Sequence, residues 1–116
     1  MNLIWVTITD KGKAEERLHF RAETDIDLSY YAVFDSHYVS DTAVSAYQHS
    51  CYWFGPKKVK AGENVVLYTR AGTASTENRT DGSTYHFLFR GLTNPLYTNP
   101  NSAPILFELN TWSARK

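Results

Sequence analysis

The most constraining feature of this sequence is a short segment in which apolar and polar residues alternate. In the segment 16–23, basic residues alternate with three apolar ones, Leu18, Phe20 and Ala22. Successive side chains of a β-strand point to opposite faces, so this period of two places one set in a core and the other in solvent. The segment therefore predicts a half-buried β-strand.

Six further segments have the composition of short strands, because Val, Ile, Tyr, Phe and Trp favour strands and are concentrated in them. They are 3–9, 30–35, 47–54, 64–70, 85–90 and 105–109. The adjacent Val65, Val66 and Leu67 predict that 64–70 is a central strand buried on both faces. We interpret 41–49 as a loop, since it is too short to stand alone as a helix.

Two predicted connections are longer than the roughly 4–6 residues that are typical. The segment 71–84 is rich in Gly, Ser and Thr and has almost no apolar residues. The segment 91–104 contains two Thr-Asn-Pro tripeptides, which form turns. We therefore expect two long loops at these positions.

The pattern of about seven short strands joined by turns, without a long helical segment, is typical of an immunoglobulin-like β-sandwich. A chain of 116 residues has the length of a single domain. We therefore predict one all-β sandwich domain over 1–116.

The second half of the chain resembles a known family. It begins with an aromatic segment that ends in proline, Tyr52-Trp53-Phe54-Gly55-Pro56. The segment 59–69 follows, in which an apolar residue, a lysine and a glycine lead into a strand with the pattern Val-x-Leu. This order resembles the middle of a lamin-tail domain. Downstream, Gly91-Leu92, Leu96-Tyr97 and a final apolar strand extend the resemblance over residues 52–116. The resemblance implies an immunoglobulin-like sandwich that serves as an interaction module.

Charge and apolar content argue against two classes of partner, nucleic acid and membranes. Twelve Lys and Arg balance twelve Asp and Glu, so no net field attracts a polyanion and nucleic acid is not an expected partner. No apolar run approaches the roughly 20 residues needed to cross a bilayer, so we expect no membrane insertion. The start of the chain lacks the basic and apolar regions of a secretory signal, which predicts a cytoplasmic location.

Two arrangements could carry catalysis. His49 and Cys51 share one face of a predicted strand, as a thiol activated by an imidazole would. Unpaired cysteine is among the most buried residue types, so we interpret Cys51 as a buried structural residue. The carboxylates of Asp25 and Asp27 have no second acidic pair at a plausible strand end, so glycosidase chemistry is not indicated. We predict no catalytic residues.

A metal site would need His and carboxylate ligands at close range. Asp35 and His37 share a face if their strand continues, and His49 or His86 could complete the set. Zinc signatures place pairs of Cys or His at fixed intervals, whereas these histidines are scattered. We predict neither a metal site nor a cofactor.

Long loops on a rigid scaffold are the usual binding elements of a sandwich. We therefore predict a non-catalytic protein-interaction or scaffolding module that binds a protein partner through 71–84 and 91–104. Three residues are expected to contribute: Tyr97 as an aromatic anchor, Arg79 as a charge partner and Asn94 as a hydrogen-bonding group.

An alternative binding surface contains Trp53 and the basic cluster Lys57, Lys58 and Lys60. Aromatic and basic side chains together can bind single-stranded nucleic acid. Lysines beside a sheet edge also discourage aggregation, and we prefer this interpretation.

Three other functions remain open. A small-ligand or carbohydrate-binding module would use Trp53 and exposed tyrosines. The tyrosines considered are Tyr30, Tyr31, Tyr38, Tyr47, Tyr85 and Tyr97. Exposed edge strands would also allow a homo-oligomer or a self-assembling structural protein. A cysteine or metal enzyme is the least favoured hypothesis.

Overall fold

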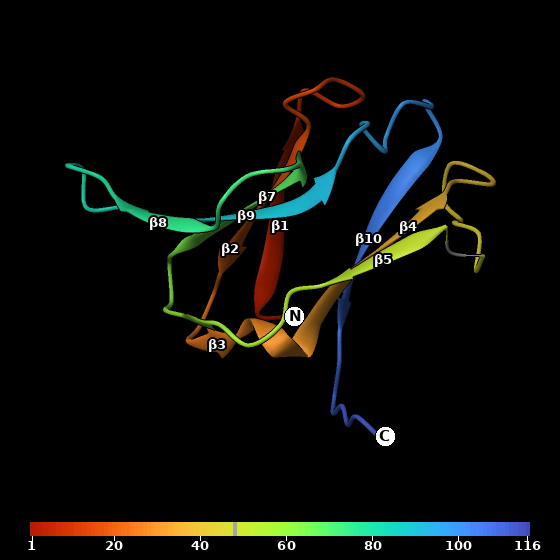
Figure 1. Ribbon diagram of the computed structural model, residues 1–116. Coiled ribbons are helices and arrows are strands. Elements are labelled where there is room, and N and C mark those ends of the chain that lie inside the picture. Colours follow the sequence, from red (N-terminus) through yellow and green to blue (C-terminus); the bar gives the residue numbers. More distant parts are fainter. Residues whose placement is uncertain (48) are drawn as a thin grey trace. The chain divides into compact units, whose positions relative to one another are not determined.

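The chain is all-β over the residues that the computed structural model describes, 1–47 and 49–116 (Figure 1). These residues form ten strands and one 3-10 helix, η1. The strands are β1 (Leu3–Thr9), β2 (Arg17–Ala22), β3 (Ile26–Asp27), β4 (Tyr31–His37), β5 (Ser50–Trp53), β6 (Lys58–Val59), β7 (Asn64–Arg70), β8 (Ser75–Asn78), β9 (Thr84–Leu92) and β10 (Ser102–Glu108), and η1 is Leu28–Tyr30. Position 48, which belongs to the predicted loop 41–49 and the predicted strand 47–54, lies outside the described residues.

Backbone contacts divide the chain into two compact units. The first consists of Met1–Ile26 and Val59–Asn99, and the second of Asp27–Lys58 and Pro100–Lys116. The single domain over 1–116 stays a prediction. Within the described residues, no helix is long and apolar enough to cross a membrane.

The first unit contains a five-stranded sheet in the order β1-β2-β7-β9-β8. Neighbouring strands run antiparallel except β7 and β9, which are parallel. The alternation in β2 is confirmed, because Leu18, Phe20 and Ala22 are buried while Arg21 is exposed. The central position of β7 is also confirmed, since it lies between β2 and β9.

The second unit contains a three-stranded antiparallel sheet in the order β10-β4-β5. Ala32, Val33 and Leu106 are among its buried residues. Pro104 lies within β10, an edge strand, where its missing N–H need not interrupt a ladder. A further two-stranded sheet consists of β3 and β6.

Three strands were not expected from the sequence: β3, β6 and β8. The prediction that 71–84 is wholly a loop is wrong, because β8 pairs with β9 over Ser75–Asn78. Every residue of β8 is exposed, so its stability derives from backbone pairing rather than from a buried face. The expected loop 91–104 is shorter than predicted, since β9 ends at Leu92 and β10 begins at Ser102.

The segment between β9 and β10 is held by a buried carboxylate. Glu16 is fully buried, and its two oxygens accept four hydrogen bonds. The donors are the backbone N–H groups of Gly12, Leu96 and Tyr97 and the hydroxyl of Thr69, at 2.6–3.0 Å. Burying a charge is costly unless it is well hydrogen-bonded, and this arrangement meets that requirement.

Candidate binding face

One face of the five-stranded sheet gathers aromatic and basic side chains. Tyr68 in β7 lies opposite Arg17 in β2 and Phe89 in β9. Directly opposed residues point to the same side of a sheet, and residues two apart in a strand share that side. Val66 and Phe87 therefore belong to this face, and the buried Leu18 and Leu67 to the other. We call this surface, on β2, β7 and β9, the binding face.

Four rings on the binding face form a continuous series, which we call the ring ladder: Tyr68, Tyr85, Phe87 and Phe89. Tyr68 stacks on Phe89 with ring centroids 5.0 Å apart, and Tyr85 stacks on Phe87 at 6.0 Å. The two pairs are joined by Tyr68 and Phe87, whose centroids are 6.4 Å apart. All four residues are half-buried, so part of each ring surface stays accessible to solvent.

Three arginines lie over the ring ladder. The guanidinium carbon of Arg79 is 3.7 Å from the centroid of Tyr85, and that of Arg70 is 4.6 Å from Tyr68. Arg17 also approaches Tyr68, at 5.6 Å. These distances are those of cation–π contacts, which favour a guanidinium above an aromatic ring.

Each arginine also forms an ion pair at the rim of the face. Arg17 binds Asp10 at 3.2 Å, Arg70 binds Glu15 at 3.0 Å and Arg79 binds Glu77 at 2.8 Å. The three carboxylate side chains are between 43% and 54% exposed. Exposed pairs of this kind contribute about 0–1 kcal/mol each, so they orient the arginines without fixing them strongly.

A groove of about 290 Å³ opens on the binding face. Its lining includes Arg17, His19 and Arg79 and the rings of Tyr68, Tyr85 and Phe87. The described residues that line it include no Asp or Glu. The groove therefore combines aromatic walls with positively charged hydrogen-bond donors.

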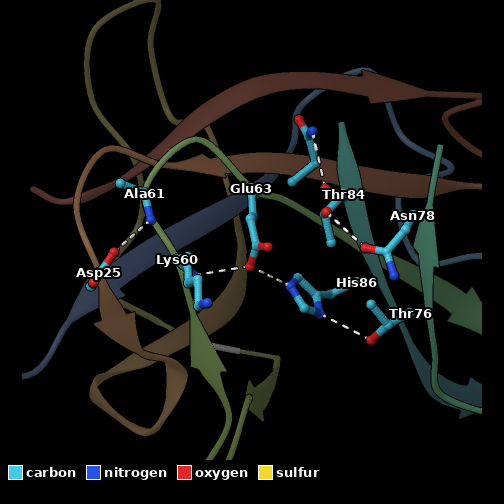
Figure 2. Close-up of polar contacts among 9 residues, drawn as sticks. Asp25, Lys60, Ala61, Glu63, Thr76, Asn78, Thr84 and His86 are labelled. Atoms are coloured by element: carbon cyan, nitrogen blue, oxygen red, sulfur yellow. Dashed lines mark hydrogen bonds and ion pairs between the residues drawn. The ribbon is translucent and has the colours of Figure 1, made fainter. Parts of the chain in front are cut away.

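A polar cluster on the opposite side of β9 holds β8 in place (Figure 2). His86 is 7% exposed, and its Nε2 lies 2.9 Å from Glu63 Oε1 while its Nδ1 lies 3.1 Å from Thr76 Oγ1. A carboxylate on Nε2 favours a proton there, which leaves Nδ1 to accept from the Thr76 hydroxyl. Nearby, Thr84 donates to Asn78 at 2.9 Å.

The electrostatics of Glu63 fit this arrangement. Partial burial acts to raise its pKa, but hydrogen bonds from His86 and from the backbone N–H of Lys60, together with the positive charge of the Lys60 side chain, lower the pKa below its usual value. Carboxylate, imidazole and hydroxyl stand in the order of a general-base relay. Here their geometry joins β8 and β9 to the turn before β7, and so positions the β8–β9 turn that carries Arg79.

The structure separates the three residues expected to bind a partner. Arg79 is exposed and belongs to the binding face. Asn94 is exposed in the segment 93–101. Tyr97 is only 3% exposed, so the expectation that its ring forms a surface anchor is wrong. Its backbone N–H donates to the buried carboxylate of Glu16.

The alternative surface is organised around Trp53 rather than around its lysines. Trp53 is 45% exposed, donates from Nε1 to the carbonyl of Ser29 at 2.8 Å and meets Trp112 edge-on at 4.9 Å. Lys58 forms an ion pair with Asp27 at 3.2 Å. Lys57 is half-buried, and Lys60 is exposed in the first unit.

The expectation that Cys51 is buried is wrong. Its side chain is exposed on the edge strand β5, and with Trp53 and Trp112 it lines an apolar cavity of about 330 Å³. The expectation rested on the general preference of cysteine for buried sites, and the face of β5 that carries Cys51 is open to solvent.

Of the histidines considered for a metal site, the structure brings His37 and His49 close together but not His86. His49 Nε2 lies 3.4 Å from His37 Nδ1, whereas the side chain of Asp35 is buried and accepts a hydrogen bond from Ser50. His86 belongs to the polar cluster of the other unit. Across 1–47 and 49–116, no three His, Cys, Asp or Glu residues are grouped so as to hold a metal ion.

The tyrosines expected as a surface platform divide into three groups by burial. Tyr30, Tyr38 and Tyr47 are exposed, Tyr85 is half-buried in the ring ladder, and Tyr31 and Tyr97 are buried.

No family model, curated protein or solved structure matches this chain.

Most of the binding face is not predicted from the sequence, although the sequence contains a signal for it. Tyr85, Phe87 and Phe89 occur at alternate positions, as do Arg17 and His19. Period two shows that such residues share a face. Only the pairing of β2, β7 and β9 shows that the two sets lie on the same one.

Proposed function

We propose that this chain is a non-catalytic interaction module that binds a protein partner through the binding face. The observation that carries the proposal is the ring ladder with three arginines above it, beside a groove open to solvent. Tyr and Arg are enriched among the residues that dominate the energetics of protein interfaces. Their aromatic surface also provides a large contact area at low cost in side-chain entropy.

The charges around the face favour a protein over a polyanion. Asp10, Glu15 and Glu77 stand at its rim, each in an ion pair with one of the three arginines, so the charges around the face are mixed. Nucleic-acid affinity depends mainly on unpaired positive charge against phosphates. A rim of mixed charges around aromatic residues is instead the usual composition of a protein interface.

The test compares two tyrosine truncations. Tyr85→Ala removes part of the ring ladder, and Tyr30→Ala removes a tyrosine that is 43% exposed in the other unit. Partners captured by the wild-type chain are purified, and their dissociation constants are measured for all three proteins. We expect Tyr85→Ala to raise Kd by at least about tenfold, the size of a loss at an interface hot spot, and Tyr30→Ala to leave it unchanged.

Each alternative outcome has a distinct meaning. Unchanged affinity in Tyr85→Ala, with circular dichroism showing a folded protein, would exclude the binding face as the interface. An equal loss in both variants would show that the effect is not specific to this face. Capture that depends on a glycan rather than on a protein would favour the carbohydrate-binding alternative.

We also propose the immunoglobulin-like sandwich and the lamin-tail relationship as the fold of the module. The turn at 60–63 and the buried β7 that follows support this proposal. Sandwiches of this class have antiparallel sheets, whereas β7 and β9 are parallel. An experimental structure tests it: two packed sheets with Greek-key connections would support the relationship, and separate units without that connectivity would refute it.

A further inference from the structure

We infer that the groove on the binding face takes an acidic polypeptide segment, in which Asp or Glu side chains are flanked by aromatic or apolar ones. This inference rests on the proposed function and names the chemistry of its partner. Arg17, His19 and Arg79 line the groove, and the described lining residues include no carboxylate. A carboxylate that enters the groove would therefore meet the positive charge and the N–H donors of the arginines. No acidic residue among the described residues that line the groove would repel it.

The existing ion pairs do not block such a ligand. Glu77 contacts Arg79 through Nε, so the terminal N–H groups of the guanidinium take no part in that bond. A guanidinium carries five N–H donors arranged as a fork that matches a carboxylate. The Asp10 and Glu77 side chains are 43% and 53% exposed. Exchanging such a partner for another carboxylate costs little, because exposed pairs are worth only about 0–1 kcal/mol.

The rest of the groove fits the flanking residues of the segment. Tyr68, Tyr85 and Phe87 present ring surface beside the arginines. A volume of about 290 Å³ is at the lower end for small-molecule pockets, which suits one or two side chains of an extended chain. His19 is held by Asn64, whose Oδ1 lies 2.9 Å from His19 Nε2, so this wall is pre-organised.

Further hydrogen bonds extend this pre-organisation. The Asn64 amide donates to the carbonyl of Thr84, at 3.3 Å, which directs its Oδ1 toward His19. Thr76 and Glu63 hold His86 and thereby β8 (Figure 2). The turn that follows β8 carries Arg79. A site whose walls are fixed before binding loses less entropy when its ligand arrives.

The experiment uses fluorescein-labelled decapeptides with the full-length chain. One peptide alternates Glu with Tyr, and its matched control replaces every Glu by Gln. The protein variants are Arg79→Gln, which removes the charge at similar size, and Arg115→Gln, which alters an exposed arginine of the other unit. Fluorescence anisotropy gives Kd for each combination, and an oligothymidylate of ten nucleotides serves as competitor.

We expect the Glu peptide to bind the wild type at least about tenfold more tightly than the Gln peptide, and Arg79→Gln to remove most of this difference. Arg115→Gln should behave as the wild type. Equal binding of both peptides, or an unchanged Kd in Arg79→Gln, would overturn the inference. Displacement by oligothymidylate at lower concentration than by unlabelled Glu peptide would also overturn it and assign the groove to single-stranded nucleic acid.

The inference and the proposed function can fail separately. If Tyr85→Ala raises the Kd for the captured partner but neither peptide binds, the interaction module is supported and the acidic segment is excluded as its ligand. Amide chemical shifts recorded as the Glu peptide is added locate its site. If none of the shifts that change belongs to β2, β7, β8 or β9, the peptide does not bind in the groove. If both Tyr85→Ala and Arg79→Gln are without effect on every ligand, both proposals fall.

Discussion

The backbone N–H of Tyr97 donates a hydrogen bond of 3.0 Å to the buried carboxylate of Glu16, although the two residues are 81 positions apart. The neighbouring Leu96 donates to the same carboxylate at 2.9 Å. One acidic side chain thus fixes the segment that follows β9 from within. This explains why Tyr97 is buried in a stretch whose sequence is typical of a surface loop.

Replacing this carboxylate should be strongly destabilising. Glu16→Gln keeps the size of the side chain but substitutes an NH₂ group for one acceptor oxygen. That NH₂ would face N–H donors, which would be left buried without partners. Since each such group costs about 1–3 kcal/mol, we expect the free energy of unfolding in urea to fall by about 2–4 kcal/mol.

Glu15→Gln is the matched control for this prediction. Glu15 is 54% exposed and pairs with Arg70 at the surface. Its replacement should cost less than about 1 kcal/mol. A similar loss in both variants would mean that the Glu16 hydrogen bonds are not what stabilises this region.

A methyl group at Gly72 should disturb the ring ladder. A Cβ there would lie 2.4 Å from the ring of Phe89, which is closer than real contacts allow. We expect Gly72→Ala to displace that ring and its stacking on Tyr68, at a cost of about 1–3 kcal/mol. The near-ultraviolet circular dichroism spectrum and the aromatic proton shifts should change, while the far-ultraviolet spectrum is kept.

Thr73→Ala provides the comparison for Gly72→Ala, since Thr73 is an exposed neighbour in the same segment. It should leave both spectra as they are. Unchanged aromatic shifts in Gly72→Ala would contradict the close approach of this backbone to Phe89.

The carboxylate of Asp27 should make the free energy of unfolding depend on pH in the acidic range. The hydrogen bonds from Ser29, with further contributions from Lys58 and Lys57, lower the pKa of Asp27 from 3.8 to about 2. Because the folded pKa lies below the unfolded value, the ionised group stabilises the fold fully above about pH 4, and this contribution is lost as the pH falls toward about 2.

Asp27→Asn tests this pH dependence. Asp27 caps η1 through its bond to the Ser29 N–H, so the variant should lose about 1 kcal/mol near neutral pH. Urea unfolding of both proteins should show this gap closing as the pH is lowered to about 2. Asp41→Asn, at an exposed position of the same unit, should follow the wild type throughout. A gap that stays constant with pH would contradict the lowered pKa.

The thiol of Cys51 should react in the native protein. Because its side chain is exposed, we expect a thiol reagent to label it within about tenfold of the rate measured in denaturant. Trp112 lines the same cavity, so Trp112→Ala should raise the native rate. Arg115→Ala, which changes a residue outside that lining, should not. A thiol that labels only after unfolding would contradict the exposure of β5.

The sequence predicted the elements whose signal is local. Alternation in β2 and the apolar run of β7 identified both strands and their buried residues, because side-chain period follows directly from strand geometry. The segment 75–78 gave no such signal, since all four residues of β8 are polar and exposed. Its strand exists because the backbone of β9 offers hydrogen-bonding partners, which no local pattern records.

The sequence by itself thus determined the all-β class, the main strands and the side chains that alternate within each. Tertiary structure alone decided which strands are neighbours, and therefore that Arg17 and Tyr68 share a face with Phe89. It also decided that Glu16 is buried among backbone donors and that Cys51 is exposed. The physical reason is that periodicity is encoded within a few residues, whereas burial and register depend on hydrogen bonds and contacts between segments distant in the chain.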